Sequence, residues 1–153
     1  MPNKNDNTRI ITPEKPFPIT TPMQLRFNDI DMLGHVNNTS YFELFDLGKN
    51  EYFKAGRHGQ VDWTRPPLMI VNINIDFIAQ THFDEPVAVR TQTTHIGNKS
   101  ITMLQQLVNT DTLEVKAQCQ SVLVHFNVET GVPCTITEAW RNDIQTFENQ
   151  PIK

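Results

Sequence analysis

The stretch NTSYFELFDLGKNEYFKA, residues 38–55, has helical periodicity, whereas most of the chain around it alternates like strands. Its apolar and small residues recur at spacings of three, four and seven: Tyr41, Leu44, Phe45, Gly48, Tyr52 and Ala55. Polar residues occupy the opposite face: Glu43, Asp46, Asn50 and Lys54. This pattern predicts a long helix with a broad apolar side that needs a partner layer.

The ends of this helix carry stop and start signals. Gly56 stands where a left-handed terminator is expected. Asn37 or Asn38 is suited to cap the start. Ser40 and Glu43 also fit a capping box, so the start is defined only to within two or three residues.

Outward from the helix, the sequence predicts strands. Met23–Asn28 alternates between apolar and polar residues and predicts a short strand before it. After a proline-containing loop, further strands are expected over residues 71–77, 86–96, 100–109, 113–128 and 132–136. Thr137 can cap a final helix that carries Trp140, Ile144 and Phe147 on one face.

The order of these elements predicts one α+β domain. Short turns join consecutive strands, so neighbours pair antiparallel, and a curved sheet of five to six strands can wrap the helix. We assign residues 22–153 to this domain and residues 1–21 to a flexible N-terminal arm. The sheet's free edges make association with a second subunit plausible.

Composition excludes several classes of protein. The net charge is −4 with no Lys/Arg cluster, which argues against nucleic-acid binding. No apolar run has the length of a signal peptide or membrane span, so we expect a cytoplasmic protein without membrane association. For Cys119 and Cys134, two free thiols are favoured over one disulfide.

The stretch before the long helix carries the candidate chemistry. Asp31 lies in a polar loop that enters the helix N-terminus, where unpaired amides polarise a carbonyl and stabilise an oxyanion. A nearby carboxylate can activate water or attack directly. A thioester suits this minimal set, because a thiol with a pKa of about 8.5 leaves readily. Asp29 is the neighbouring carboxylate and is better explained as a cap or turn residue.

Neither a metal nor an organic cofactor is expected. The other histidines, at positions 58, 82, 95 and 125, do not pair at metal-ligand spacing. His95 and His125 fall in phase with core-facing strand residues. Motifs for a serine nucleophile, a nucleotide phosphate or a dinucleotide are absent from the sequence.

The segment RFNDIDMLGHVNNTSY, residues 26–41, resembles the hotdog-fold thioesterases, in particular the 4-hydroxybenzoyl-CoA thioesterase-like family and the related acyl-ACP thioesterases. The resemblance covers about residues 23–136 and implies a hotdog fold. It implies that Asp31 is the catalytic carboxylate and that the amide of Asn38 polarises the thioester carbonyl. His35 and Asn37 match positions that shape the site, and the histidine is proposed to take part in catalysis in the acyl-ACP branch.

Two positions depart from the acyl-ACP branch. Leu33 replaces an asparagine, and Gln80 falls near a glutamate that it cannot replace as a base. We count Asp31, His35 and Asn38 as catalytic candidates. The substrate-binding candidates are Gly34, Asn37, Tyr41 and Lys99. Core packing for Tyr41, loop fixation for His35 and a plain turn for Lys99 remain the alternatives.

The resemblance therefore implies hydrolysis of an acyl-CoA or acyl-ACP thioester. It also implies a homodimer or homotetramer with the acyl site at the subunit interface, which fits the free sheet edges. The alternatives are a hotdog module that binds an acyl thioester without turnover and, less favoured, an acyl-thioester hydratase or dehydratase. The acyl group, the carrier, and the role of Asp31 as base or nucleophile are left open.

Overall fold

A computed structural model describes residues 6–149. Five strands form one antiparallel sheet in the order β1-β3-β4-β5-β2. In chain order the elements are β1 (Ile19–Met23), α1 (Asn38–Gly56), β2 (Leu68–Phe77), β3 (Val87–Ile96), β4 (Ser100–Asn109), β5 (Val115–His125) and α2 (Glu138–Glu148).

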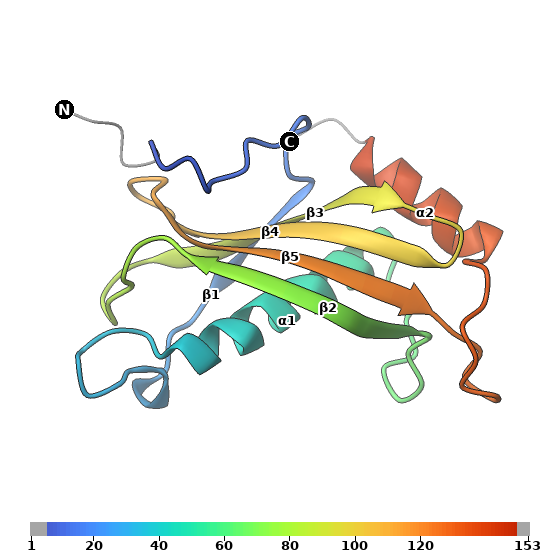
Figure 1. Cartoon of the computed structure of the whole chain (residues 1–153), viewed down its shortest axis with the longest axis horizontal. Coiled ribbons are helices and arrows are strands. Elements are labelled where there is room, and N and C mark those ends of the chain that lie inside the picture. The colour runs from blue at the N-terminus through green and yellow to red at the C-terminus, as the bar shows by residue number, and fades with distance from the viewer. Residues whose placement is uncertain (1–5, 150–153) are drawn as a thin grey trace.

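The long helix α1 lies against one face of this curved sheet, mainly over β1, β3 and β4 (Figure 1). Its first half joins one apolar cluster, in which Leu44 and Phe45 meet Val89 and Leu107. This arrangement confirms the predicted α+β class, with a single long helix as the inner layer. The sheet contains five strands, within the predicted range.

Gly48 sets the distance between the helix and the sheet. A Cβ atom at this position would lie 2.6 Å from Val89 Cγ1 and 2.9 Å from Gln105 Nε2. Gln105 is buried and its Nε2 donates to the Phe45 carbonyl of α1 at 2.9 Å. The helix and β4 are thus joined by both apolar packing and a side-chain hydrogen bond.

A second cluster closes the other end of α1. Tyr52 and Phe53 pack with Trp140 and Ile144 of α2. The Tyr52 hydroxyl also donates to Glu148 Oε1 at 2.5 Å. The side of α2 predicted to be apolar therefore faces the core, and Thr137 caps this helix as predicted by accepting from the Trp140 amide.

The segment before β1 crosses the opposite face of the sheet from α1 (Figure 1). Glutamine side chains of the sheet hold its backbone. Gln118 accepts from the Ile11 amide at 2.7 Å, and Gln106 donates to the Ile11 carbonyl at 2.9 Å. Gln92 donates to the Lys15 carbonyl at 3.0 Å.

Two strand predictions are wrong. Met23 is the last residue of the first strand and not its beginning, so residues 19–21, which we assigned to the arm, pair with β3. The chain turns after Arg26 because its amide donates to the Asp29 carboxylate and residues 27–29 form a 3₁₀ turn. Residues 132–136 form only an isolated bridge at Pro133, which has no amide hydrogen to extend a ladder.

His95 also differs from its prediction. A bulge between Thr93 and His95 shifts the pairing with β4, and His95 is exposed. His125 is buried as predicted, with Nδ1 at 3.2 Å from Cys134 Sγ. Both cysteines are free thiols, and burial raises the pKa of the Cys119 thiol to about 11. Neither helix in the described range has the length and apolar character of a bilayer-crossing segment.

The close approach at Gly48 predicts a steric penalty for any side chain there. We expect Gly48→Ala to lower the free energy of unfolding by about 1–3 kcal/mol, as overpacking does in cores, although alanine has the higher helix propensity. Urea denaturation measures this change. Glu51→Ala, at an exposed position of the same helix, should change stability by less than about 0.5 kcal/mol; equal stability of wild type and Gly48→Ala would contradict the packing argument.

Candidate active site

The loop before α1 is a tight turn closed by a bridge between Ile30 and Val36. The Gly34 amide donates to the Asp31 carbonyl at 3.1 Å, and the Asp31 amide donates to the His35 carbonyl at 2.9 Å. Gly34 has a φ of +81°, in the left-handed region that favours glycine. Gly34 therefore shapes the turn that presents Asp31.

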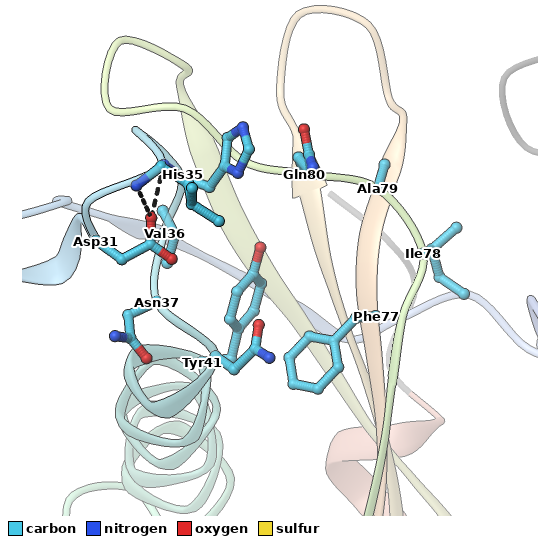
Figure 2. Close-up of a pocket in the computed structure, with 11 residues that line it drawn as sticks. Asp31, His35, Val36, Asn37, Tyr41, Phe77, Ile78, Ala79 and Gln80 are labelled. Atoms are coloured by element: carbon cyan, nitrogen blue, oxygen red, sulfur yellow. Dashed lines mark hydrogen bonds between the residues drawn. The ribbon is translucent and has the colours of Figure 1, made fainter.

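The Asp31 carboxylate is fixed by backbone amides of its own turn. Its Oδ1 atom accepts from the Leu33 amide at 2.9 Å and from the His35 amide at 3.3 Å (Figure 2). Among residues 6–149, Oδ2 has no hydrogen-bond donor from the protein. One oxygen thus orients the group, and the other is available to water or a substrate.

The N-terminus of α1 lies directly behind this turn. Asn37 is the cap, and its Oδ1 accepts from the Thr39 amide at 3.0 Å. The Ser40 amide donates to the Asn37 carbonyl, and the Asn37 amide donates to the Asp29 carbonyl. Among residues 6–149, the Asn38 amide has no acceptor. This amide lies at the positive end of the helix dipole.

Asp29 fixes the start of the loop through hydrogen bonds with Arg26 and Asn37. Its carboxylate is buried, accepts from the Arg26 amide at 2.7 Å, and pairs with the Arg26 guanidinium at 3.0 Å. Burial opposes ionisation of this carboxylate, but the hydrogen bonds from the Arg26 side chain and backbone outweigh it and lower the pKa of Asp29. These contacts agree with the cap or turn role that the sequence predicted for Asp29.

The segment after β2 supplies the facing wall. The Val36 amide donates to the Thr81 carbonyl at 2.8 Å, which joins the two loops. The buried Lys116 Nζ donates to the Gln80 carbonyl at 3.1 Å and to Glu85 at 3.0 Å. The amide of Ile78 donates in turn to the Lys116 carbonyl, so β5 holds this wall in place.

Tyr41 lies between the two walls (Figure 2). Its hydroxyl is 2.8 Å from Thr81 Oγ1, and its ring meets Phe77 edge-on with centroids 5.2 Å apart. Burial raises the pKa of the Tyr41 hydroxyl, so this group stays neutral at physiological pH. His35 makes a similar edge contact, at 5.2 Å, with His82.

Together these walls enclose a pocket of about 390 Å³, which we call the Asp31 pocket. It is lined by Asp31, Leu33, residues 35–38, Tyr41 and residues 77–80. Five of the residues proposed from the sequence are therefore brought together: Asp31, His35, Asn37, Asn38 and Tyr41.

Two other candidates lie outside this pocket. Gly34 shapes the turn without lining the cavity. Lys99 lies in the turn between β3 and β4, which contacts the α2 region through the hydrogen bond from the Ile136 amide to the Asn98 carbonyl. That turn lies at the far end of the sheet from the start of α1 (Figure 1), so Lys99 does not reach the Asp31 pocket of its own chain.

Sequence reasoning missed the second wall of the pocket except for Gln80. Phe77 was identified only as a strand residue, while Thr81 and Lys116 were not singled out. Their roles depend on contacts between segments more than 30 positions apart, such as Tyr41 with Thr81 and Lys116 with Gln80. No local pattern encodes such contacts. In residues 6–149, histidine, cysteine and acidic side chains do not form a group of three that could bind a metal ion.

The family model of the thioesterase-like superfamily matches residues 25–144. The chain belongs to this superfamily. A solved thioesterase from Thermus thermophilus, complexed with coenzyme A and Zn, is 28% identical with a TM-score of 0.78, covering 88% of this chain and 98% of that one. A predicted thioesterase from Bacillus stearothermophilus is 30% identical with a TM-score of 0.77, covering 86% and 97%.

A 1,4-dihydroxy-2-naphthoyl-CoA thioesterase from Synechocystis shares the fold at 16% identity, with a TM-score of 0.73 and coverage of 86% and 98%. A comparison with curated proteins finds no match to the chain. The sheet, its central helix and these neighbours confirm the hotdog fold and the thioesterase family that the sequence predicted. Family membership supports thioesterase activity in general terms.

The Asp29 contacts predict an acid-sensitive part of the stability. Because its folded pKa is lowered, the stabilisation is fully present above the unfolded value of about 3.9 and is lost as pH falls through the folded pKa. We expect Asp29→Asn to be less stable than wild type at pH 6 and the difference to shrink towards pH 3. Urea denaturation at both pH values tests this; a difference that is independent of pH would contradict it.

Proposed function

We propose that this protein hydrolyses an acyl-CoA thioester to the free acid and coenzyme A, with Asp31 as the catalytic carboxylate. The observation that carries the proposal is the pairing, in one pocket, of a fixed carboxylate and an unpaired helix-start amide. In this proposal the thioester carbonyl accepts from the Asn38 amide, in the pocket that Asp31 also lines.

The helix end supplies the electrostatic part of catalysis. As water adds to the carbonyl, negative charge develops on its oxygen, and the Asn38 amide together with the dipole of α1 stabilises that charge. The α1 backbone is already in place against Gly48 and Gln105. Little rearrangement is therefore needed in the transition state.

Asp31 supplies the acid–base or nucleophilic part. As a general base, its carboxylate takes a proton from the attacking water, the carbon–sulfur bond then breaks, and coenzyme A leaves as a thiolate that regains a proton. As a nucleophile, it would form an acyl anhydride that water hydrolyses to the same products. A thiolate needs no strong acid to leave, which fits a pocket with one carboxylate and the nearby His35.

Coenzyme A is the carrier that the comparisons favour over an acyl carrier protein. The Thermus thermophilus thioesterase, at 28% identity, was solved with coenzyme A. The departures at Leu33 and Gln80 from the acyl-ACP branch point the same way. Gln80 lines the pocket and serves in this proposal as a polar contact to the substrate. Free thiols at Cys119 and Cys134 fit a reducing compartment such as the cytoplasm.

We also propose a homodimer or higher homo-oligomer formed along β2. The opposite edge strand, β1, is only five residues long and contains Pro22, two features that discourage edge pairing. The β2 edge is ten residues long, and its Met69 and Val71 are 50% and 56% exposed. From a neighbouring subunit, Lys99 remains a candidate for contact with the substrate.

The rival function is binding without turnover. It would use the same pocket, but Asp31 would serve only to hold the turn through Leu33 and His35. The two functions differ in one observable, release of free thiol.

For Asp31→Asn, we expect thiol release from a panel of short, medium, long and aromatic acyl-CoAs to fall by about 10²–10⁴-fold, the usual contribution of a positioned acid–base group. An amide can still accept from the Leu33 and His35 amides, but it neither takes a proton nor attacks at a useful rate. Asp111→Asn, an exposed carboxylate between β4 and β5, is the matched control and should retain full activity. Full activity of Asp31→Asn would overturn the assignment of Asp31, and no thiol release by wild type from any acyl-CoA would favour the binding module.

For the assembly, we expect Val71→Lys to convert an oligomer to a monomer, because it places charge on an edge that would be buried. Size-exclusion chromatography with light scattering measures the mass. Thr20→Lys, on the β1 edge, should leave the mass unchanged. A wild-type monomer, or an oligomer that persists in Val71→Lys, would contradict pairing along β2.

A further inference from the structure

The second wall of the Asp31 pocket is formed mostly by a connection between strands and not by a strand itself. β2 ends at Phe77, and β3 begins only at Val87. Residues 77–80 line the pocket opposite Asp31 (Figure 2). Beyond the end of β2 this wall has no sheet ladder of its own, so other contacts must satisfy its backbone groups and fix its position.

Lys116 stands at an irregularity of β5 beside this wall. In the pairing with β4, it is the extra residue between Val115 and Ala117, which pair with two consecutive residues of β4. Its carbonyl accepts from the amides of Ile78 and Ala79, at 2.9 and 3.0 Å. An extra residue of this kind bends a strand and re-aims a side chain, and such bulges are frequent next to active sites.

The Lys116 side chain binds the same connection at two further points. It is only 5% exposed, and its ammonium donates to the Gln80 carbonyl at 3.1 Å and to Glu85 Oε1 at 3.0 Å. The third partner is Glu114, at 2.5 Å. An ammonium has three donors, and three acceptors surround this one. Lys116 is therefore engaged by the protein and does not serve as a direct contact for a substrate.

Lys116 carries its charge inside the protein. Burial opposes that charge, but the hydrogen bonds to Glu114 and Glu85 outweigh it and raise the pKa of Lys116. A buried ion pair contributes little net stability compared with well-packed apolar side chains of similar volume. Stability alone therefore does not account for a lysine at this position.

We propose that Lys116 is a positioning residue of the Asp31 pocket: its ammonium holds residues 77–80 in place opposite Asp31 and the Asn38 amide, and thereby limits the acyl groups that the pocket accepts. Lys116 acts through the Gln80 carbonyl and Glu85 and does not touch the reacting atoms. Its effect on catalysis rests on the proposed function, whereas its effect on the wall does not.

The substitution Lys116→Met separates the side chain from the backbone contacts, because the carbonyl that binds Ile78 and Ala79 remains. We expect the wall to recede, so that kcat/KM for the slimmest acyl-CoA that the wild type hydrolyses falls by about tenfold through loss of orientation. The value for the bulkiest one should fall less, because a wider pocket accommodates it. The ratio of the two values should therefore shift towards the bulky substrate.

This ratio is the decisive readout, since both values scale with the amount of folded enzyme and a loss of stability cancels. Lys54→Met, at an exposed position of α1, is the matched control for the loss of one positive charge and should leave both values unchanged. Glu85→Gln weakens the clamp while Glu114 still pairs with Lys116. It should shift the ratio in the same direction, and it keeps the proposal testable if Lys116→Met fails to fold.

Hydrogen exchange tests the wall without any substrate. In Lys116→Met and Glu85→Gln, amides of residues 78–86 should exchange faster than in wild type, while those of α1 and the central strands should exchange as in wild type. If wild type releases no thiol from any acyl-CoA, the proposed function fails, and the exchange measurement still decides whether Lys116 holds this wall.

A ratio that stays at the wild-type value in the folded variants overturns the positioning role. Unchanged exchange over residues 78–86 overturns the clamp itself. Faster exchange spread evenly over the whole sheet would also overturn it, because Lys116 would then contribute to global stability and not to the position of one wall.

Discussion

The close contact of α1 with β3 and β4 is the constraint on which the rest of this structure depends. The missing side chain at Gly48 lets the helix backbone approach Val89, and Gln105 then joins the helix to the sheet through the Phe45 carbonyl. Because a helix is a stiff rod, fixing its middle also fixes its first turn. The position of the Asn38 amide is therefore set by contacts further along the same helix.

Backbone hydrogen bonds fix the turn around Asp31 in addition to the packing of α1. Backbone amides around Asp31 are nearly all engaged: those of Leu33 and His35 by the Asp31 carboxylate, and that of Val36 by the Thr81 carbonyl. Asp29 holds the turn with its own carboxylate and carbonyl. The Asp31 carboxylate and the Asn38 amide remain available to a substrate, because the polar groups around them already have hydrogen-bond partners within the protein. Such a network keeps the polar groups of a small pocket oriented.

The sequence revealed what is encoded locally. The spacing from Tyr41 to Ala55 predicted α1, and the segment around Asp31 indicated the family. Asn37 was one of the candidate caps for α1, and Thr137 was predicted to cap α2. It did not reveal features that depend on pairing at a distance. The pairing of His95 is shifted by a bulge opposite β4. The chain turns after Arg26 because the Arg26 amide donates to the Asp29 carboxylate. The wall around Gln80 is held by Lys116 from another strand.

The segment that crosses the outer face has a consequence for how this fold meets other molecules. An uncovered sheet face can pack against a second sheet. Here the side chains of three glutamines donate to backbone carbonyls of the N-terminal segment: Gln92 to Lys15, Gln106 to Ile11 and Gln118 to Arg9. A second sheet could pack on this face only after these hydrogen bonds were broken. Removal of the segment up to Lys15 would leave the three glutamines without these backbone partners and would favour association through the outer face of the sheet.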